Sequence, residues 1–272
     1  MPVAERLDIM HRAIFLSDFH LGSRLAKAEH LLSFIESNEA ATWYLVGDIY
    51  DIKRLRRRHY WPASHGRVVR ALRRKARAGA RIVYLPGNHD PDLRNRTGPR
   101  ALLPGVEVAE RAIHTTADGR KLLVVHGDEY EPAAPASTPG YWAGCAAYLT
   151  GVAASEIVGR SRALLGFDYW SLAAFLKNRT LPYVPFVSKY RANLRQAARL
   201  HGANGVVCGH IHHASIEFGD GILYLNCGDW VDSCTAVVED WSGNLGLLPW
   251  SRRAGSSERA PEVLSPQAVA AR

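Results

Sequence analysis

Histidine and aspartate side chains gather directly after several short apolar runs of this sequence. The stretch "VVCGHIHHAS" carries three histidines within four positions. Of these, His210 and His212 are one residue apart, so in an extended segment both point to the same side. Four other apolar runs end in clusters of the same kind: Asp18 with His20, Asp48 with Asp51, Asn88 with His89 and Asp90, and His126 with Asp128. A solvated loop explains any one cluster, but such clusters in succession favour a common metal site.

Strands and crossover helices are the elements that would bring these clusters together. The short apolar runs 13–17, 43–46 and 81–85 read as strands, and helical patterns at 28–40 and 66–79 separate them. Strand and helix in alternation are typical of a parallel sheet with crossover helices. The carboxyl ends of such strands meet at one edge of the sheet, where ligands bind in open α/β folds. We therefore expect the clusters to meet at that edge.

The second half of the chain predicts antiparallel strands. Two hairpins are expected to turn at Asp118-Gly119 and near Asp220-Gly221, and "SCTAVVEDWSGNLGLLPW" reads as a third. Between them, residues 139–202 read as helical and are rich in aromatic and small residues, so they are expected to pack on the core or to form a cap. Residues 1–250 are then one domain, and the Ser-, Pro- and Arg-rich segment 251–272 is expected to be a disordered tail.

The net charge indicates the kind of partner, and the cysteine content indicates the cellular compartment. The net charge of +8 favours an anionic partner, either a phosphorylated substrate, an acidic membrane surface or nucleic acid. The four cysteines have no CxxC spacing, so we expect reduced thiols in a cytoplasmic protein. The start of the sequence lacks the apolar core of a signal peptide, and no apolar run has the length of a membrane span. Any membrane contact is then expected to be peripheral, at the inner face.

The clusters together match an ordered motif set. They read D-x-H at 18–20, GD-x-x-D at 47–51, GNH-D at 87–90, a single His126 and GH-x-H at 209–212. This pattern resembles the calcineurin-like metallophosphoesterases. The resemblance implies an α/β fold, a four-layer αββα sandwich of two mixed sheets with a helical cap insertion. It also implies two metal sites and a shared ligand: Asp18, His20 and His212 on one ion, Asn88, His126 and His210 on the other, and Asp48 bridging both.

The ligand set and its neighbours predict a hydrolytic mechanism. Imidazole and oxygen ligands without thiolate suit two divalent ions, manganese above all and also iron or zinc. Such ions lower the pKa of a bridging water, whose hydroxide attacks the phosphorus. His89 is expected to stabilise or protonate the leaving oxygen, and Asp90 to orient its ring. We expect Asp51 and Asp128 to act as turn or supporting hydrogen bonders, and His213 to be a bystander.

Within the family, the chain looks similar to the UDP-2,3-diacylglucosamine pyrophosphatases of lipid A synthesis and their bacterial relatives. The likeness lies in size, in the helical insertion after His126 and in "NCGDWVDSCTAVVE"; the chain differs in carrying His89 where those enzymes carry Arg. It implies an amphiphilic substrate, a lipid-linked pyrophosphate or phosphoester. The basic stretch 52–62 would attract its head group or an anionic membrane, unless it is only a solvated loop.

Three alternatives to this function remain open at the level of sequence. One is a phosphatase or phosphodiesterase acting on another phosphorylated metabolite or lipid. Another is a metal-dependent nuclease, which the charge would suit, although the insertion is apolar rather than a basic groove and nucleic acid is not the expected partner. The third is a binding protein on a degenerate phosphoesterase scaffold, which requires lost ligands, and none of the motif positions has lost one.

Overall fold

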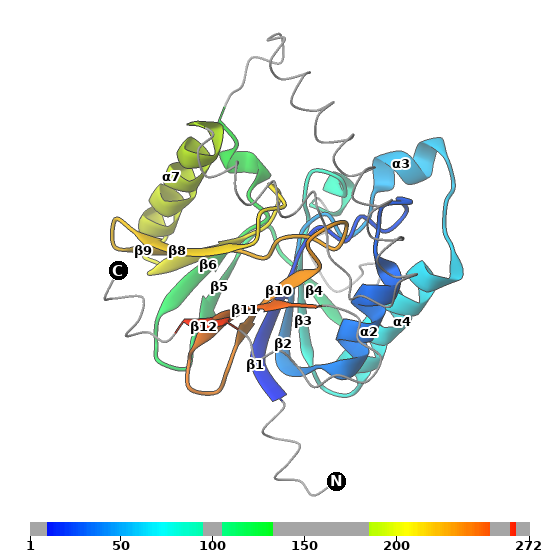
Figure 1. The fold of residues 1–272 in the computed structure, drawn as a ribbon, viewed down its shortest axis with the longest axis horizontal. Helices are drawn as coiled ribbons and strands as arrows, with labels where there is room; N and C mark the ends of the chain where they lie inside the picture. The colour runs from blue at the N-terminus through cyan, green and yellow to red at the C-terminus, as the bar shows by residue number, and fades with distance from the viewer. Residues whose placement is uncertain (1–9, 95–104, 133–184, 251–261, 265–272) are drawn as a thin grey trace, which may run out of the picture.

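Two β-sheets face each other at the centre of the structure, a computed structural model that describes residues 10–94, 105–132, 185–250 and 262–264. The first sheet has seven strands in the order β12-β11-β10-β1-β2-β3-β4. The second has five strands in the order β5-β6-β7-β9-β8. Both sheets are mixed, since parallel and antiparallel neighbours occur in each. Figure 1 shows the helices on the outer sides of the two sheets.

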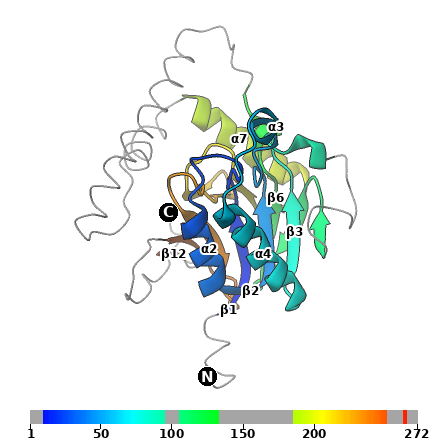
Figure 2. The same ribbon diagram turned by 90° about the vertical axis from the view of Figure 1, so that its right-hand side faces the viewer.

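The first sheet holds the alternation of strand and helix that the sequence predicted. Its parallel strands are β1 (Met10–Leu16), β2 (Glu39–Val46), β3 (Arg81–Leu85) and β4 (Val106–Val108). Its antiparallel strands are β10 (Thr235–Glu239), β11 (Leu245–Pro249) and β12 (Glu262–Leu264). The helices α2 (Ala28–Ser37) and α4 (Ala63–Arg77) contact each other and cover its outer face (Figure 2). The short helix α3 (Ile52–Arg57) follows β2.

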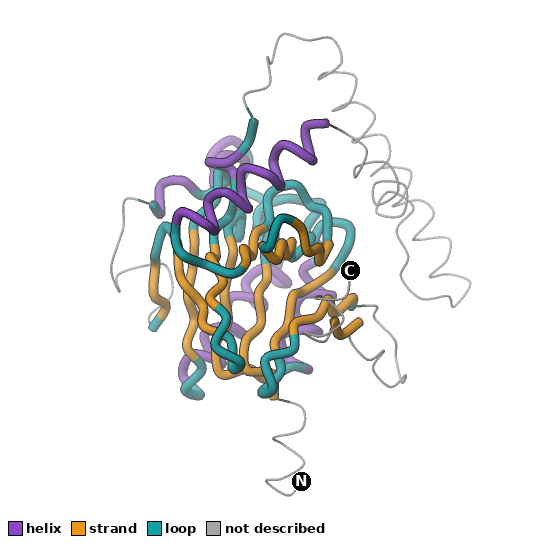
Figure 3. Tube along the Cα trace, turned by 90° about the vertical axis from the view of Figure 1, so that its left-hand side faces the viewer, coloured by secondary structure: helices purple, strands orange, loops and turns teal. Residues whose placement is uncertain are grey.

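The second sheet carries one helix on its outer face. Its strands are β5 (Ala112–Thr115), β6 (Lys121–Val124), β7 (Gly205–Cys208), β8 (Ser215–Gly219) and β9 (Ile222–Asn226). The helix α7 (Pro185–Leu200) contacts β7 and β9 (Figure 3). Two 3-10 turns, η1 (Pro91–Leu93) and η2 (Asp128–Tyr130), follow β3 and β6.

Three apolar cores separate four layers. Between the sheets, Phe15 and Tyr44 stack with ring centroids 4.8 Å apart and pack with Val124 and Leu225 of the second sheet. A second core joins the first sheet to α2 and α4, and a third joins the second sheet to α7 through Tyr190. Burial of these side chains is the main favourable contribution to the stability of the fold. The expected α/β class with an αββα sandwich is confirmed.

The three expected hairpins are confirmed as well. The strand pairs β5–β6, β8–β9 and β10–β11 are antiparallel, and the first two turn at Asp118-Gly119 and Asp220-Gly221. Asp220 and Gly221 both have positive φ, as a type I′ hairpin turn requires. The structure adds α3, β4 and β12 to the elements that the sequence predicted.

The expected cap and tail lie largely outside the described residues. Of the segment 139–202, the structure describes α7 and the turn after it, and α7 packs on the second sheet, where Tyr190 and Leu194 are buried. Of the expected tail 251–272, it describes β12, which pairs with β11 from Leu245 to Leu247. These three residues thus differ from the expected disorder, because the edge of β11 offers backbone hydrogen bonds to an added strand. Within the parts of the chain described, no helix has the length and apolar character to cross a membrane.

Candidate metal centre

The loops after β1, β2, β3, β6 and β7 meet at one end of the two sheets. Backbone hydrogen bonds tie the first two together, from Asp18 N to Gly47 O (3.0 Å) and from His20 N to Asp48 O (2.9 Å). Another joins the last two, from Gly209 N to the carbonyl of His126 (3.0 Å). In Figure 1 this end lies opposite the N-terminus, near α3. The structure therefore brings the polar clusters together at one end of the sheets, as the sequence predicted.

Asp18, His20 and His212 form the first group of donor atoms. His212 Nε2 lies 3.2 Å from Asp18 Oδ1 and 3.3 Å from His20 Nε2. Asp18 Oδ1 is buried and accepts no hydrogen bond from the described residues. A buried carboxylate oxygen without a donor, beside two imidazole nitrogens, is an arrangement that a divalent cation would complete. The three donors therefore fit a metal ion.

Asn88, His126 and His210 form the second group. His126 Nε2 lies 3.2 Å from Asn88 Oδ1, and the rings of His126 and His210 have centroids 5.3 Å apart. His126 Nδ1 lies 2.9 Å from the carbonyl oxygen of Val46, to which it donates in the tautomer that fits this contact. That tautomer leaves Nε2 with a lone pair for a metal, the usual arrangement of a histidine ligand held by a supporting hydrogen bond.

Asp48 lies between the two groups. Its Oδ2 is 3.8 Å from His20 Nε2, and its Oδ1 is 3.4 Å from His126 Nε2. Although burial alone would raise the pKa of this carboxyl, the His126 imidazole lowers it to about 2. The carboxylate is therefore charged at neutral pH, with one oxygen turned toward each group. This is the placement that a ligand shared by two cations needs.

The other donors carry matching electrostatics. Burial opposes the charge of Asp18, but the His212 imidazole holds its pKa well below the usual range. Burial also opposes a charge on His126, and Asp48 raises the pKa of that ring to about 10. The carboxylates of Asp18 and Asp48 thus create a negative local field, which favours positive charge at this place. A divalent cation would occupy that field in place of the protons.

Backbone conformation at this centre is unusual. Five of its residues have left-handed φ although none is glycine: Asp18 (56°), His20 (49°), Asp48 (54°), His210 (69°) and His212 (52°). Each such residue costs on the order of 1 kcal/mol or more, and such conformations concentrate at functional sites. The strands and the loop hydrogen bonds above hold these residues in place.

Two glycines allow the carboxylates to approach the backbone. A Cβ on Gly209 would lie 2.4 Å from Asp18 Oδ2, and one on Gly87 would lie 2.2 Å from Asp48 Oδ1. Both distances are far below van der Waals contact, so a side chain at either position would displace a carboxylate of the centre. Asp18 Oδ2 instead accepts a hydrogen bond from His210 N (3.0 Å).

His89 lies beside the centre, and its carboxylate partner is Asp51. Its Nδ1 is 3.3 Å from Asp51 Oδ1, and its Nε2 is 4.0 Å from Asp48 Oδ2. The hydrogen bond with Asp51 raises the pKa of the His89 ring. Asp51 is also the N-cap of α3, since its Oδ1 accepts a hydrogen bond from Arg54 N (3.2 Å). Its expected supporting role agrees with these contacts.

The role expected for Asp90 needs correction. Its Oδ1 accepts from Gly87 N (2.6 Å), and its Oδ2 accepts from Ile49 N (2.9 Å) and from the hydroxyl of Tyr84. Asp90 is fully buried, and these donors take both of its oxygens. It therefore fixes the loops that follow β2 and β3 rather than the ring of His89.

Further contacts were not anticipated from the sequence. Asp229 Oδ2 lies 3.6 Å from His212 Nδ1, and Glu131 Oε2 lies 3.5 Å from His210 Nε2. In the sequence, Asp229 is the acidic residue of "NCGD" and Glu131 is the last residue of "GDEYE". Their acidic side chains were the sequence signals that could have indicated a place near the histidines. His213, the expected bystander, turns to α7, where its Nδ1 lies 3.3 Å from Arg191.

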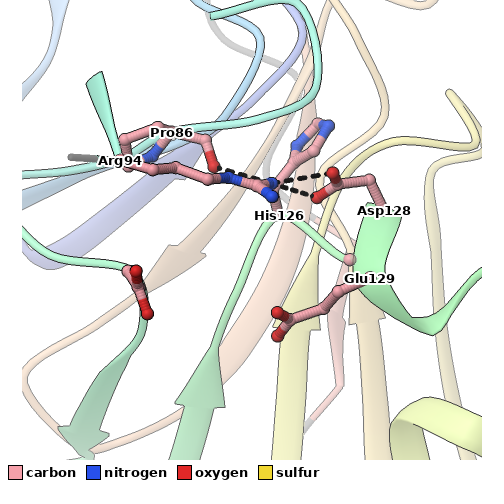
Figure 4. Close-up of a pocket in the computed structure, with 7 residues that line it drawn as sticks. Pro86, Arg94, His126, Asp128 and Glu129 are labelled. Atoms are coloured by element: carbon pink, nitrogen blue, oxygen red, sulfur yellow. Dashed lines mark hydrogen bonds and ion pairs between the residues drawn. The ribbon is translucent and has the colours of Figure 1, made fainter. Parts of the chain in front are cut away.

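Asp128 supports the edge of the centre. The guanidinium of Arg94 lies 2.6 Å from Asp128 Oδ1 and 3.4 Å from the carbonyl oxygen of Pro86. Figure 4 shows this bridge across a small cavity, beside the ring of His126. Glu110 and Glu129 also line the cavity. The ion pair joins η2 to the segment that follows η1, in line with the supporting role expected of Asp128.

The chain belongs to the calcineurin-like phosphoesterase family, whose model matches residues 11–214. Members of the family are metal-dependent hydrolases of phosphoester bonds, and the clusters of imidazole and carboxylate donors agree with that class. The sequence matches no curated protein.

Several solved structures resemble the chain. Vacuolar Protein Sorting 29 from Cryptosporidium parvum has 13% identity over 93% of this chain and 97% of its own, with a TM-score of 0.45. The phosphoesterase Yfce from E. coli has 15% identity over 87% of each chain, with a TM-score of 0.40. A protein from Streptococcus pneumoniae, described as a predicted phosphoesterase, has 16% identity over 93% of this chain and 98% of its own, with a TM-score of 0.38.

Proposed function

We propose that this chain uses two divalent metal ions to hydrolyse a lipid-linked pyrophosphate or phosphoester similar to UDP-2,3-diacylglucosamine. The observation that supports two ions is the placement of Asp48, with one carboxylate oxygen toward His20 and the other toward His126. The donor set, rich in imidazole and without thiolate, favours manganese, with iron and zinc as alternatives. The residues that would hold the ions are Asp18, His20, Asp48, Asn88, His126, His210 and His212.

Neighbouring residues of the chain position the donor side chains. The carbonyl oxygen of Val46 holds the ring of His126 in orientation through Nδ1. The carboxylate of Asp229 lies 3.6 Å from Nδ1 of His212, on the side of the ring away from Asp18. Two divalent ions, when bound, would supply Lewis acidity toward phosphate oxygens and lower the pKa of a coordinated water molecule. The carboxylate of Asp48 would offset the repulsion between two cations, because it lies between the two donor groups.

His89 is the residue that we propose to move a proton. Its pKa is raised by the hydrogen bond with Asp51, which favours the protonated ring. Nδ1 faces Asp51, which leaves Nε2 to donate to the oxygen that leaves the phosphorus. The negative charge on that oxygen is thereby neutralised as the bond breaks.

The lipid part of the proposal rests on the sequence resemblance and on charge. The exposed side chains of α3 and the residue after it are largely basic, including Lys53, Arg56, Arg57 and Arg58, and α3 begins directly after Asp51. A basic element beside the centre would attract an anionic head group or the anionic surface in which a lipid substrate lies. Of the apolar residues expected to contact acyl chains, Phe186 lies in α7 and is half-buried, and the others fall in 139–184, outside the described residues.

The test is turnover of a substrate panel by the manganese-loaded protein, with products identified by mass. The panel contains UDP-2,3-diacylglucosamine, its deacylated head group, other lipid phosphates, bis-p-nitrophenyl phosphate and single-stranded DNA. We expect the acylated substrate to exceed the deacylated one by about a hundredfold in kcat/KM, because burial of acyl methylenes helps to orient the phosphate. Equal values for the two would contradict the lipid substrate, and preferred cleavage of DNA would favour a nuclease.

A further inference from the structure

The carbonyl group of Gly209 closes a tight turn around the first histidine of GH-x-H. Ile211 N donates to Gly209 O (2.9 Å), and His210 between them has a φ of 69°. An i to i+2 hydrogen bond around a residue of positive φ defines the rarer and more strained of the two γ-turns. His212 follows, also with a left-handed φ (52°). Contacts from other segments must therefore hold the turn in this conformation.

Asn226, the last residue of β9, binds this carbonyl from outside the turn. Its Nδ2 donates to Gly209 O (2.7 Å), and its Oδ1 accepts from Gly228 N (3.0 Å). The two contacts fix the orientation of the amide, because a carbonyl oxygen can only accept and a backbone N–H can only donate. The side chain is fully buried, so water does not compete for either contact. The hydroxyl of Tyr190 also approaches Gly209 O, but only to 3.5 Å.

The segment that begins with Asn226 is itself tied to both strands beside the centre. Cys227 N donates to the carbonyl oxygen of Cys208, the last residue of β7 (2.9 Å). The hydroxyl of Ser17, which directly follows β1, donates to the carbonyl oxygen of Gly228 (3.1 Å). Asn226 therefore links the turn to a support that other elements of the fold hold in place.

We propose that Asn226 is a positioning residue for both metal ions and acts through the carbonyl group of Gly209. This inference rests on the two-metal centre of the function proposed above. His210 belongs to the second donor group and His212 to the first, and both lie within three residues of the carbonyl that Asn226 holds. Without the amide donor the strained turn can relax, and both rings turn away from their donor groups. Binding of both ions then becomes weaker, although every donor is still present in the chain.

The experiment compares Asn226→Ala with Asn38→Ala. Asn38 is also buried, and its Nδ2 also donates to a backbone carbonyl, that of Phe34 (2.8 Å), but it precedes β2, whereas the centre follows that strand. Manganese binding is measured by equilibrium dialysis with metal analysis, and urea unfolding is measured on the metal-free variants. If Asn226→Ala does not fold, Asn226→Asp replaces it, since it keeps the shape and the acceptor for Gly228 N. Its added negative charge attracts cations, so the charge cannot be the cause of weaker binding.

We expect Asn226→Ala to raise the Kd for both manganese ions about tenfold or more, the usual effect of removing a residue that orients metal ligands. Asn38→Ala should lower stability by a similar amount but leave both Kd values within about twofold. Hydrolysis of bis-p-nitrophenyl phosphate by Asn226→Ala should recover as manganese is raised, because bound ions draw both rings back into place.

An unchanged Kd in the Asn226 variant, a loss at one ion only, or an equal loss in Asn38→Ala would overturn the inference. So would activity that stays low when manganese saturates the Asn226 variant. A wild-type protein that binds two manganese ions but hydrolyses no substrate would instead contradict the proposed function, and the binding comparison would still decide the role of Asn226.

Discussion

Asp48 and His89 lie 4.0 Å apart at their nearest charged atoms but have different surroundings. Asp48 has an oxygen toward each donor group, whereas His89 lies to one side with Asp51 behind it. We predict that Asp48→Ala loses both metals and all activity. His89→Asn should keep the metals and lower kcat by about a hundredfold or more, the usual contribution of a positioned acid. Metal analysis of the two purified variants beside kcat is the measurement, and equal metal loss in His89→Asn would show that His89 is a ligand.

Asp90 and Asp51 offer a second contrast at the residue scale. Asp90→Ala leaves four donors without their acceptor in a fully buried place, those of Gly87, Ile49, Tyr50 and Tyr84. We predict a loss of about 3 kcal/mol in the free energy of unfolding, the cost of leaving buried groups unsatisfied. Asp51→Ala should cost only about 1 kcal/mol, the value of a helix cap, but should lower kcat through His89. Urea unfolding of both metal-free variants gives the comparison, and a larger loss for Asp51→Ala is the contrary result.

The donor residues could be predicted from the sequence more easily than the residues that hold them in place. Every donor follows an apolar run as part of a short motif, so local sequence was enough to single out residues such as His126 and His212. The partners of those donors come from distant segments, as with Asp229 behind His212. Adjacency misled in one case, because Asp90 follows His89 in sequence while Asp51 contacts its ring in space. The ligand roles themselves stay predictions until metal binding is measured.

At the scale of elements, the end of β7 is held close to the loop after β1. A Cβ on Gly209 would lie 2.4 Å from Asp18 Oδ2. We predict that Gly209→Ala loses metal affinity and most activity, because the added methyl displaces the Asp18 carboxylate. Gly66→Ala is the control, since it lies in α4, where the nearest atom belongs to the flexible end of Arg70 at 3.2 Å and alanine favours the helix. Titration of both variants with manganese tests this, and wild-type affinity in Gly209→Ala would contradict it.

The elements that were not predicted from the sequence are short, or they form only by pairing with a strand that is distant in sequence. The strands β4 and β12 have three residues each, too few for a periodic pattern, and each forms at a sheet edge on a neighbour that tertiary contacts supply. The helix α3 is marked by Asp51 as its cap, but its basic composition reads as a solvated loop. Strands that are buried along their whole length, such as β7 and β9, were evident because their apolar residues form continuous runs.

At the scale of the whole molecule, the net charge is +8, because basic side chains outnumber acidic ones. On α4, Arg74 pairs with Glu36 and Arg67 with Glu29, while Lys53 of α3 has no such partner among the described residues. We predict that part of the protein sediments with anionic vesicles at low salt and is released at high salt, because surface charges are screened over about 10 Å at 0.1 M. Neutral vesicles are the control, and equal sedimentation with both would contradict an electrostatic contact.

The central claim, that two metal ions held by this centre carry out phosphoester hydrolysis, is tested most directly by counting ions and turnover together. The protein is stripped by chelation, checked to be metal-free and titrated with manganese while bound metal and hydrolysis of bis-p-nitrophenyl phosphate are followed. We predict no activity without metal, about two ions per chain at saturation and activity that follows the second ion, since both donor groups must be filled around Asp48. Full activity in the verified metal-free protein, or saturation of activity with a single ion, would contradict the claim.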